Sequence, residues 1–439
     1  MRAILFLSLF LFCVGCKNVT KPTKASTTVI NDSLRIKSDE YLTKLTELKQ
    51  FNGVVFLLKD GKEVLRKAYN ISEDVTSSLF VTEKSQFDLR SISKLFAKIS
   101  VLQLEEKGIL KRSDFIKKYL PNFPNGDKIT IQHLIENRSG LPRELSVSNK
   151  KLIDVSPEEV IELAVRETLE FTPGTEERYS NVGFQLIYYI IGKIHKNSYA
   201  DYLQDTFFTP LHMKGSGSNF YENVGQKTQY AHGHYLNDDT TIVCECSIPD
   251  DDMQMGNLYA TVDDLVAFSK QFDSKKHKAI LHDGSISHAG GTRGKRAYIE
   301  RNLDKRYTII FLANYDEVPF QNLVTDLQKI LEGKPVNMPK AINRTAISLP
   351  RELLLKYEGT YDFVDAGHLI LTLKVENDSL FIYQKGKNNG AIYPENETTF
   401  FGDKTSQESI QFVKENSGKY HILMDFKGVQ WKGINIDKK

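Results

Sequence analysis

Apolar runs of strand length lie near both ends of the segment 34–333. Residues 53–58 and 64–69 are two such runs, and an Asp-Gly turn pair between them predicts a β-hairpin. Two more runs, at 296–300 and 307–312, predict strands close to the end of the same segment. Strands are therefore expected near both ends of this part of the chain.

Helical patterns fill the space between these strands. Apolar residues recur at helical spacing over 91–107 and 181–195. Thr261 and Asp264 have the spacing of a capping box, with Asp in place of Glu, and predict a third helix over 265–272. Strands at both ends around a helical middle predict a single α+β domain.

The pattern changes after this domain. One glycine and three prolines interrupt any periodicity near its end, so we expect a linker at 334–350. Beyond the linker, short alternating apolar runs turn back on themselves at 369–383 and 410–424. These two hairpins predict a small antiparallel, barrel-like β domain over 351–439.

The N-terminus has the features of an export signal. Residues 4–12 are largely apolar but shorter than the roughly 20 residues that cross a bilayer. A Val-Gly-Cys sequence follows and resembles the lipobox of bacterial lipoproteins, so we expect residues 1–16 to be a lipoprotein-type signal with the lipid on Cys16. A cleaved signal peptide with a chance cysteine is the alternative. The polar stretch 17–33 would then tether an exported body in the cell envelope or periplasm.

Composition limits the function classes. The 58 Lys and Arg residues against 56 Asp and Glu residues give a net charge of +2, which argues against a dedicated nucleic-acid binder. A hydrophobic fraction of 40% is too high for a mostly disordered chain. Four cysteines in 439 residues are too few for a disulfide framework, so stability must come from packing. Contact with a membrane is expected only through the lipid anchor.

The first chemical motif is Ser91-x-x-Lys94, at the start of the predicted helix over 91–107. This spacing puts both side chains on one helix face, one turn apart, with the serine at the positive end of the helix dipole. A desolvated, neutral lysine can accept the serine proton, which activates the nucleophile without histidine. A second match at 148–151 lies in a polar stretch with no apolar helix behind it, so context favours Ser91.

Two further segments follow along the chain. Tyr179-x-Asn181 offers a hydroxyl that can shuttle a proton and an amide that can bind a substrate amide, although the same pattern occurs twice elsewhere by chance. A Ser-His-Ala-Gly-Gly sequence at 287–291 precedes a predicted strand. By itself that sequence is equally typical of a glycine-rich turn with a surface histidine.

Taken in order, these segments resemble the serine β-lactamase and penicillin-binding-protein-like family, in its class C and DD-peptidase-related branch. Connecting segments at 130–142, 173–183, 256–265 and 308–314 are similar as well. The resemblance implies a β-lactamase/transpeptidase-like fold, in which an antiparallel sheet is flanked by helices next to an all-helical region. Residues from 354 onward are similar to the lipocalin-like β domain often appended to these hydrolases.

The resemblance implies catalytic roles. Ser91 would be the acylated nucleophile, and Lys94 would be the base that activates it. Tyr179 would relay the proton to the leaving group and later to water, while Asn181 would orient the substrate amide. His288 stands where many β-lactamases have lysine, and a histidine with a near-neutral pKa would make turnover sensitive to pH.

The same resemblance implies an oxyanion hole. It would use the backbone N–H groups of Ser91 and Gly291, with Gly290 beside them, and losing one such donor typically costs about 3 kcal/mol. Arg90 stands where a small residue is usual and adds charge next to the nucleophile.

One departure from the family pattern concerns the substrate. Ala289 stands where many carboxypeptidases and β-lactamases have a Ser or Thr whose hydroxyl holds the substrate carboxylate. Without that hydroxyl, binding of a C-terminal D-Ala or a β-lactam carboxylate should weaken by about 1–3 kcal/mol. Thr292, Arg293 or Arg143 could supply the missing contact.

The remaining polar clusters are interpreted as structural. Cys244-x-Cys246 lacks the paired spacing of a zinc site, so two ordinary thiols or one unusual bridge are favoured over a redox pair or half of a metal site. The acidic run 250–252 and the basic run 275–278 are expected to be solvated loop charge. The sequence thus predicts no metal and no cofactor.

Together these observations predict an exported, metal-independent serine hydrolase that forms an acyl-enzyme with a small-molecule or peptide substrate. The expected substrate is an amide or ester, either a peptide containing D-residues or a small ester. A β-lactamase or D-Ala-D-Ala carboxypeptidase proper is the first alternative, disfavoured by Ala289. A noncatalytic envelope receptor or scaffold is the alternative of another class, and it would not need to keep Ser91, Lys94, Tyr179 and His288.

Overall fold

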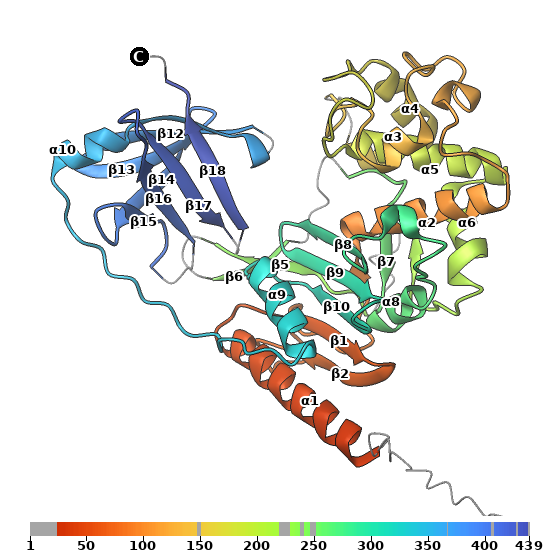
Figure 1. The fold of residues 1–439 in the computed structure, drawn as a ribbon, viewed down its shortest axis with the longest axis horizontal. Helices are drawn as coiled ribbons and strands as arrows, with labels where there is room; N and C mark the ends of the chain where they lie inside the picture. Colours follow the sequence, from red (N-terminus) through yellow and green to blue (C-terminus); the bar gives the residue numbers. More distant parts are fainter. Residues whose placement is uncertain are drawn as a thin grey trace, which may run out of the picture.

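The chain folds into an α+β domain followed by a β-barrel (Figure 1). The structure is a computed structural model that describes residues 24–146, 151–218, 229–237, 241–245, 252–366, 368–404, 408–426 and 429–437. The predicted signal with Cys16, and most of the second Ser-x-x-Lys match at 148–151, lie outside the described residues. The predicted fold class, an α+β unit with a small antiparallel barrel at the C-terminus, is confirmed.

The α-helices are α1 Lys24–Glu47, α2 Ser93–Glu106, α3 Ile131–Ile135, α4 Pro157–Val165, α5 Asn181–His195, α6 Tyr199–Leu203, α8 Val262–Ser269, α9 Phe320–Leu331 and α10 Arg351–Leu354. The shorter helical turns are η1 Arg90–Ile92, η2 Ile116–Lys118, η3 Leu152–Asp154, η4 Gln204–Phe208, η6 Lys278–Ile280, η7 Leu355–Tyr357 and η8 Val364–Ala366. The strands of the α+β domain are β1 Gly53–Lys59, β2 Lys62–Tyr69, β3 Phe87–Asp88, β4 Gly217–Ser218, β5 Gly233–Leu236, β6 Ile242–Glu245, β7 Leu258–Ala260, β8 Ser285–Thr292, β9 Lys295–Asn302 and β10 Tyr307–Ala313. Those of the barrel are β11 Gly359–Phe363, β12 Leu369–Glu376, β13 Ser379–Gln384, β14 Lys387–Pro394, β15 Thr399–Phe401, β16 Ser409–Lys414, β17 Tyr420–Phe426 and β18 Val429–Asn435.

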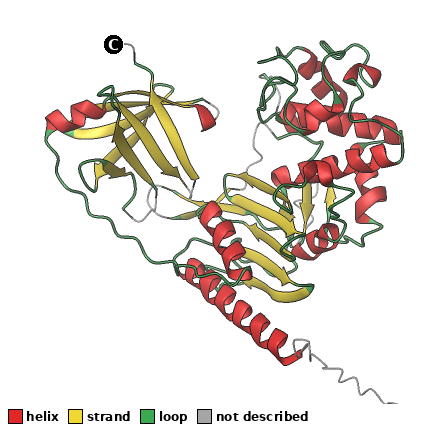
Figure 2. Ribbon diagram, viewed as in Figure 1, coloured by secondary structure: helices red, strands yellow, loops and turns green. Residues whose placement is uncertain are grey.

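A five-stranded antiparallel sheet, in the order β2-β1-β10-β9-β8, lies at the centre of the α+β domain (Figure 2). Side chains alternate between its faces, as they must in a strand. In β1, Val54 and Phe56 belong to one hydrophobic cluster, whereas Val55 and Leu57 belong to another. All four are at most 2% exposed, so both faces of the sheet are covered.

Different helices cover the two faces. Leu42 of α1 and Leu327 of α9 pack in the cluster that contains Val55. The opposite cluster takes Phe96 from α2 and Phe268 from α8, whose rings stack with centroids 3.8 Å apart. This second cluster is the larger one, and it fixes the helix that begins directly after the candidate nucleophile.

Two helix boundaries differ from the sequence prediction. The helix α2 begins at Ser93 and not at Ser91, because a 3₁₀ turn precedes it and Arg90 has a left-handed φ of 48°. The helix α8 begins at Val262, because Thr261 is its N-cap and accepts a hydrogen bond from the Asp264 backbone N–H. The predicted capping box is therefore present, and the helix starts directly after it.

The N-terminal part differs more strongly. A tether was expected over 17–33, but α1 begins at Lys24, so residues 24–33 are helical. Leu34, Tyr41 and Leu42 bury the later turns of α1 against the sheet. Once those turns are nucleated by packing, each preceding residue extends the helix at little cost, which is why a polar stretch can be helical.

The eight strands β11–β18 close into a barrel in the described part of the chain. The strand β11 pairs with both β12 and β18, which removes the free edges of the sheet. The predicted hairpins appear as β12–β13 and β16–β17. Leu371, Phe400 and Phe412 help to fill the interior, so the barrel has a hydrophobic core of its own.

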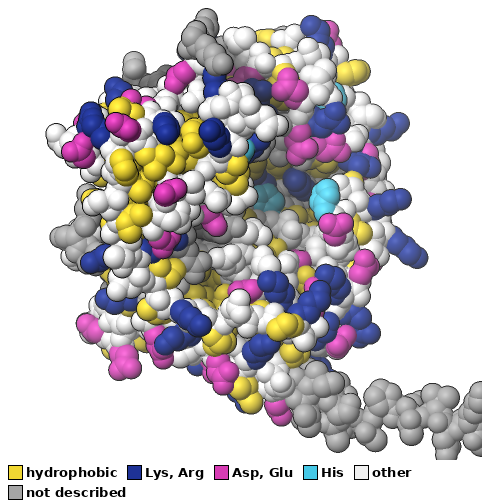
Figure 3. All heavy atoms as spheres, turned by 60° about the vertical axis from the view of Figure 1, so that its left-hand side comes forward, with side chains coloured by type: hydrophobic (Ala, Val, Ile, Leu, Met, Phe, Trp, Pro, Cys, Tyr) yellow, Lys and Arg dark blue, Asp and Glu magenta, His cyan; other side chains and the backbone are white. Residues whose placement is uncertain are grey.

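Figure 3 brings the barrel side of the molecule forward and shows acidic and basic side chains interspersed over this face, in keeping with the balanced charge. Among the helices of the described ranges, none combines the length and the apolar character needed to cross a membrane.

Candidate active site

Ser91 lies in the 3₁₀ turn η1, between the short strand β3 and helix α2. The strand β8 packs directly against this turn. A Cβ atom added to Gly290 would lie 2.3 Å from the carbonyl oxygen of Leu89 and 3.2 Å from the backbone nitrogen of Ser91. Only glycine allows this approach, which brings the predicted oxyanion-hole segment next to the nucleophile.

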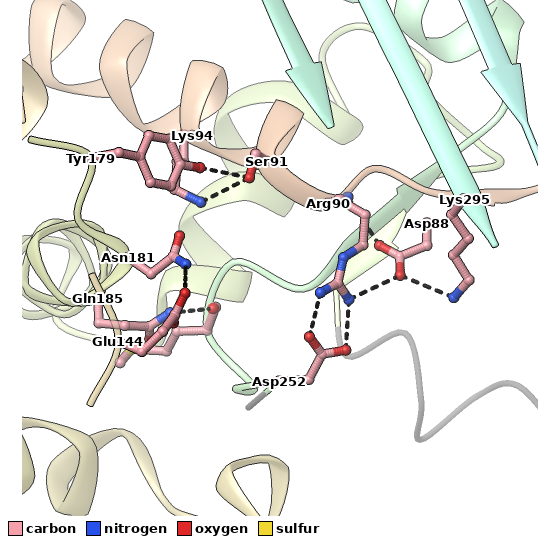
Figure 4. A network of polar contacts seen from close by, with 11 residues as sticks. Asp88, Arg90, Ser91, Lys94, Glu144, Tyr179, Asn181, Gln185, Asp252 and Lys295 are labelled. Atoms are coloured by element: carbon pink, nitrogen blue, oxygen red, sulfur yellow. Dashed lines mark hydrogen bonds and ion pairs between the residues drawn. The ribbon is translucent and has the colours of Figure 1, made fainter. Parts of the chain in front are cut away.

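Lys94 contacts the nucleophile from one helical turn away. Its Nζ donates a hydrogen bond of 3.2 Å to Ser91 Oγ (Figure 4). The side chain is only 7% exposed, and burial, with the nearby Arg90 charge, lowers the pKa of Lys94 to about 7. A substantial fraction of the lysine is therefore neutral near pH 7 and can accept the serine proton.

Tyr179 is the third member of this cluster. Its hydroxyl lies 2.7 Å from Ser91 Oγ, and the Lys94 ammonium lies 5.2 Å from the centroid of its ring. Burial raises the pKa of Tyr179 above 10, so it is a neutral phenol at neutral pH. Lys94 is thus the group suited to be the base, and Tyr179 is suited to carry a proton.

Asn181 is the first residue of α5, whose N-cap is Ser180. Its Nδ2 donates a 2.6 Å hydrogen bond to Oε1 of Glu144. Because a carboxylate only accepts hydrogen bonds, this contact fixes which way the amide faces. Figure 4 shows the Asn181 carbonyl oxygen directed toward Lys94 and Tyr179. Sequence reasoning found Asn181 but missed Glu144, which has no motif of its own.

His288 lies in β8, and its Nδ1–H donates a 2.7 Å hydrogen bond to the carbonyl oxygen of Ala289. Among the described residues it makes no hydrogen bond to Ser91, Lys94 or Tyr179. Burial, together with the neighbouring lysine charges, lowers the pKa of His288 to about 4. This pKa lies below the near-neutral value expected from the sequence, and the group whose pKa lies near 7 is Lys94.

A cleft of about 270 Å³ opens at Ser91. Its walls include Lys94, Tyr179, Asn181, Phe184, Gln185, Met253, Met255, Asn257 and Gly291. Of the three residues that could replace the missing hydroxyl at position 289, Thr292 and Arg143 line this cleft. Arg293 instead packs its guanidinium 3.7 Å from the ring centroid of Tyr235 and lies near Glu245.

An ion-pair network reaches the cleft through Arg90 and Asp252, which line it. Arg90 makes two hydrogen bonds of 2.6 Å to Asp252 and one of 3.4 Å to Asp88, which also accepts a 3.2 Å bond from Lys295 (Figure 4). Asp252 is only 7% exposed. The expectation of solvated charge over 250–252 is thus wrong for Asp252, because the unusual arginine before Ser91 binds it; residues 250–251 lie outside the described ranges.

The basic run at 275–278 also differs in part from the expectation. His277 is 4% exposed, and its Nδ1 accepts a 3.0 Å hydrogen bond from the backbone N–H of Asp273. The neighbouring Lys276 is exposed and forms an ion pair of 3.2 Å with Glu106. The lysine is surface charge as predicted, whereas the histidine closes a turn.

Cys244, in β6, is disulfide-bonded, and the other cysteines lie outside the described residues. The described part of the chain contains no cluster of His, Cys, Asp and Glu that could hold a metal ion.

Ser91 contacts a buried lysine and a tyrosine, and the domain that carries it is an antiparallel sheet flanked by helices. This combination defines the class of active-site serine hydrolase folds, and the chain belongs to that class. The family model named Beta-lactamase matches residues 39–283, more than half of the chain, so this protein belongs to the β-lactamase family, whose members are generally serine hydrolases. Ser91, Lys94, Tyr179 and Asn181 lie inside the matched range, whereas the 287–291 segment lies beyond it. The resemblance drawn from the sequence is confirmed.

Three relatives extend the comparison. The chain is 26% identical over 436 residues to penicillin-binding protein 4* of Bacillus subtilis (strain 168), covering 87% of this chain and 94% of the relative. It shares the fold of the octameric penicillin-binding protein homologue from Pyrococcus abyssi, with a TM-score of 0.59, 21% identity and coverage of 91% and 99%. It also shares the fold of the D-amino acid amidase from Ochrobactrum anthropi SV3, with a TM-score of 0.56, 17% identity and coverage of 68% and 99%.

Proposed function

We propose that this protein hydrolyses an amide or ester through an acyl-enzyme on Ser91. The observation that carries the proposal is the contact of Ser91 Oγ with both Lys94 Nζ at 3.2 Å and the Tyr179 hydroxyl at 2.7 Å. Such a pair of contacts supplies a base for the serine proton and a donor for the leaving group.

The reaction proceeds in two steps. Ser91 Oγ attacks the substrate carbonyl carbon while its proton passes to neutral Lys94, and Tyr179 delivers a proton to the departing nitrogen or oxygen. Water then attacks the acyl-enzyme, gives up a proton by the same route, and releases the acid and Ser91. Backbone N–H groups of Ser91 and Gly291 stabilise the oxyanion in both steps.

The substrate we propose is a peptide containing D-residues or a small ester. Ala289 offers no hydroxyl to a substrate carboxylate, which makes a β-lactam or a D-Ala-D-Ala terminus the less favoured substrate. The fold shared with a D-amino acid amidase supports amide chemistry on D-residues.

Export with a lipid on Cys16 is part of the same proposal. The lipobox-like sequence supports it, and so does the disulfide at Cys244, since disulfides persist mainly in oxidising compartments. Processing of the full chain that is blocked by globomycin, and lost in Cys16→Ser, would support it. Processing that is insensitive to globomycin would reject the lipid anchor and favour the alternative of an ordinary cleaved signal peptide.

The central test is labelling of the protein with a fluorophosphonate probe and, separately, with a fluorescent penicillin. We expect fluorophosphonate labelling that Ser91→Ala abolishes and that Ser148→Ala, at the second Ser-x-x-Lys match, leaves unchanged. Weak penicillin labelling would agree with Ala289, and strong labelling would favour the β-lactamase or carboxypeptidase alternative. No Ser91-dependent labelling by either reagent would reject the enzyme and favour a noncatalytic scaffold.

A further inference from the structure

Two buried amide side chains in the cleft wall each carry a polar atom for which the described part of the chain supplies no partner. Gln185 is 6% exposed and Asn257 is 7% exposed, and both line the cleft at Ser91. The atoms concerned are the acceptor Gln185 Oε1 and the donor Asn257 Nδ2. Because a buried polar group without a hydrogen bond is unfavourable, the pair points to a ligand that supplies the missing contacts.

The other end of the Gln185 amide is already held. Its Nε2 donates a 3.1 Å hydrogen bond to the carbonyl oxygen of Met255. Because a carbonyl oxygen only accepts, this bond fixes the orientation of the amide and leaves Oε1 as the available acceptor. Gln185 follows Asn181 by four positions in α5, so the two side chains share one face of the helix, about 6 Å apart along its axis (Figure 4).

A tight turn holds Asn257 next to Gln185. The backbone N–H of Asn257 donates a 3.3 Å hydrogen bond to the carbonyl oxygen of Gln254, and Gly256, the third residue of the turn, has a φ of 78°. A left-handed residue at this position is typical of a type II turn. The turn packs closely on α5, since a Cβ atom at Gly256 would lie 2.3 Å from the ring of Tyr188. Helix and turn together thus bring an acceptor and a donor to one part of the cleft.

An extended peptide offers groups that match this pair. The N–H and C=O of one residue point to the same edge of a strand, and the same edge is presented again two residues later, after about 6.4–6.8 Å. An acceptor beside a donor therefore fits one residue of a bound peptide. The spacing of about 6 Å between Asn181 and Gln185 is close to two strand residues. A peptide whose reacting residue lies at Asn181 would therefore bring a second residue to Gln185.

We propose that Gln185 Oε1 and Asn257 Nδ2 bind the N–H and C=O of the substrate residue two positions before the one that acylates Ser91. Tyr179 serves the leaving group in the proposed reaction, so this peptide subsite is placed on the acyl side. The inference rests on the proposed acyl-enzyme chemistry and narrows its substrate class. The substrate is then a peptide with at least three residues on the acyl side, and not a small ester.

The test uses N-acetylated alanine p-nitroanilides with one or three residues, in an all-D and an all-L series. In the series that is cleaved faster, wild-type kcat/KM should be at least about tenfold higher for the three-residue amide. A third substrate carries lactate in place of the first alanine, so that an ester oxygen replaces the N–H that Gln185 would accept. Its kcat/KM should be about tenfold lower than that of the three-residue amide, the effect of one hydrogen bond.

Two variants assign the contacts. Gln185→Leu removes the acceptor and should lower kcat/KM for the three-residue amide about tenfold, mainly through KM, while the lactate and one-residue substrates change little. Asn257→Ala removes the donor and should lower kcat/KM for the amide and the lactate substrate alike, since both keep the carbonyl group. Gln321→Leu, at an exposed glutamine of α9, is the matched control and should change none of the three.

Fluorophosphonate labelling separates this inference from the proposed function. If Ser91 is not labelled in the wild type, the proposed function itself fails. If Ser91 is labelled but the three-residue amide is not preferred, the peptide subsite alone is overturned. An equal loss on all three substrates in Gln185→Leu would also overturn it, because the glutamine would then only hold the 254–257 turn on α5.

Discussion

The guanidinium of Arg90 and the carboxylate of Asp252 share two hydrogen bonds of 2.6 Å across the wall of the cleft. They join the residue directly before the nucleophile to a segment more than 160 positions further along the chain. The Arg90 backbone is held in the left-handed region, at φ 48°, which a non-glycine residue rarely adopts. The ion pair therefore helps to hold a strained residue beside Ser91.

The first prediction follows from the burial of this pair. Asp252→Ala leaves a largely buried arginine without its bidentate partner, and breaking a buried pair in this way costs about 3–5 kcal/mol. Because Asp88 still accepts a hydrogen bond from Arg90, we expect the loss to lie at the lower end of this range, about 3 kcal/mol in the free energy of unfolding. Urea denaturation measures it. The double variant Arg90→Ala/Asp252→Ala should lose less than Asp252→Ala alone. Additive losses would show that the two charges are not coupled.

The second prediction concerns pH. The pKa of Lys94 is lowered to about 7, so the lysine loses its proton as the pH rises through this value, and the neutral amine is the base. The rate of fluorophosphonate labelling should therefore rise with pH, with a midpoint near 7. His288, with a pKa lowered to about 4, should add no step in this range.

The control for this profile is Lys94→Arg, whose guanidinium stays charged at every accessible pH. This variant should label slowly and without the step near neutral pH. A wild-type rate that stays flat across neutral pH, or a step that survives in Lys94→Arg, would contradict the assignment of Lys94 as the base.

The parts of the site that the sequence predicted are those with short spacing. Ser91 and Lys94 are one helical turn apart, and Tyr179 and Asn181 flank the start of one helix, so local geometry alone brings each pair together. Glu144 and Asp252 were missed because their contacts depend on the tertiary fold: Asp252 lies 162 positions after Arg90, in a part of the chain that the pairing of β3 with β7 brings near it. A run of acidic residues gives no sign of such a distant partner.

The difference between local patterns and tertiary contacts also explains which parts of the fold the sequence predicted. The hairpins, the helix over 181–195 and the barrel-like end could be predicted, because each is a periodic pattern of local sequence. The helical state of residues 24–33 could not, since it comes from the packing of Leu34 and Tyr41 in a cluster that forms only when the sheet and α9 come together in the folded domain. The lowered pKa of His288 likewise depends on burial, which a motif does not contain.

The third prediction uses two neighbouring glycines of β8. Gly290→Ala would place a Cβ atom 2.3 Å from the carbonyl oxygen of Leu89, which is backbone and cannot move without shifting the turn that carries Ser91. We expect labelling of Ser91 to fall by at least about tenfold, with a loss of about 1–3 kcal/mol in the free energy of unfolding. In Gly291→Ala the nearest atom is 3.5 Å away and the backbone N–H is kept, so folding should be nearly unchanged. Equal behaviour of the two variants would show that β8 does not pack against the nucleophile as closely as described.

The fourth prediction concerns which residue donates the proton to the leaving group. Tyr179→Phe keeps the ring over which Lys94 and Arg143 lie but removes the hydroxyl 2.7 Å from Ser91 Oγ. An amine must be protonated as it leaves, whereas p-nitrophenolate leaves without a proton, and a positioned general acid contributes about 10²–10⁴-fold. Hydrolysis of an amide substrate should therefore fall by about this factor, while hydrolysis of the matched p-nitrophenyl ester should fall much less. Steady-state kcat/KM for the two substrates measures the difference directly. If both substrates lose the same factor, Tyr179 acts before the leaving group departs, on the activation of Ser91 itself.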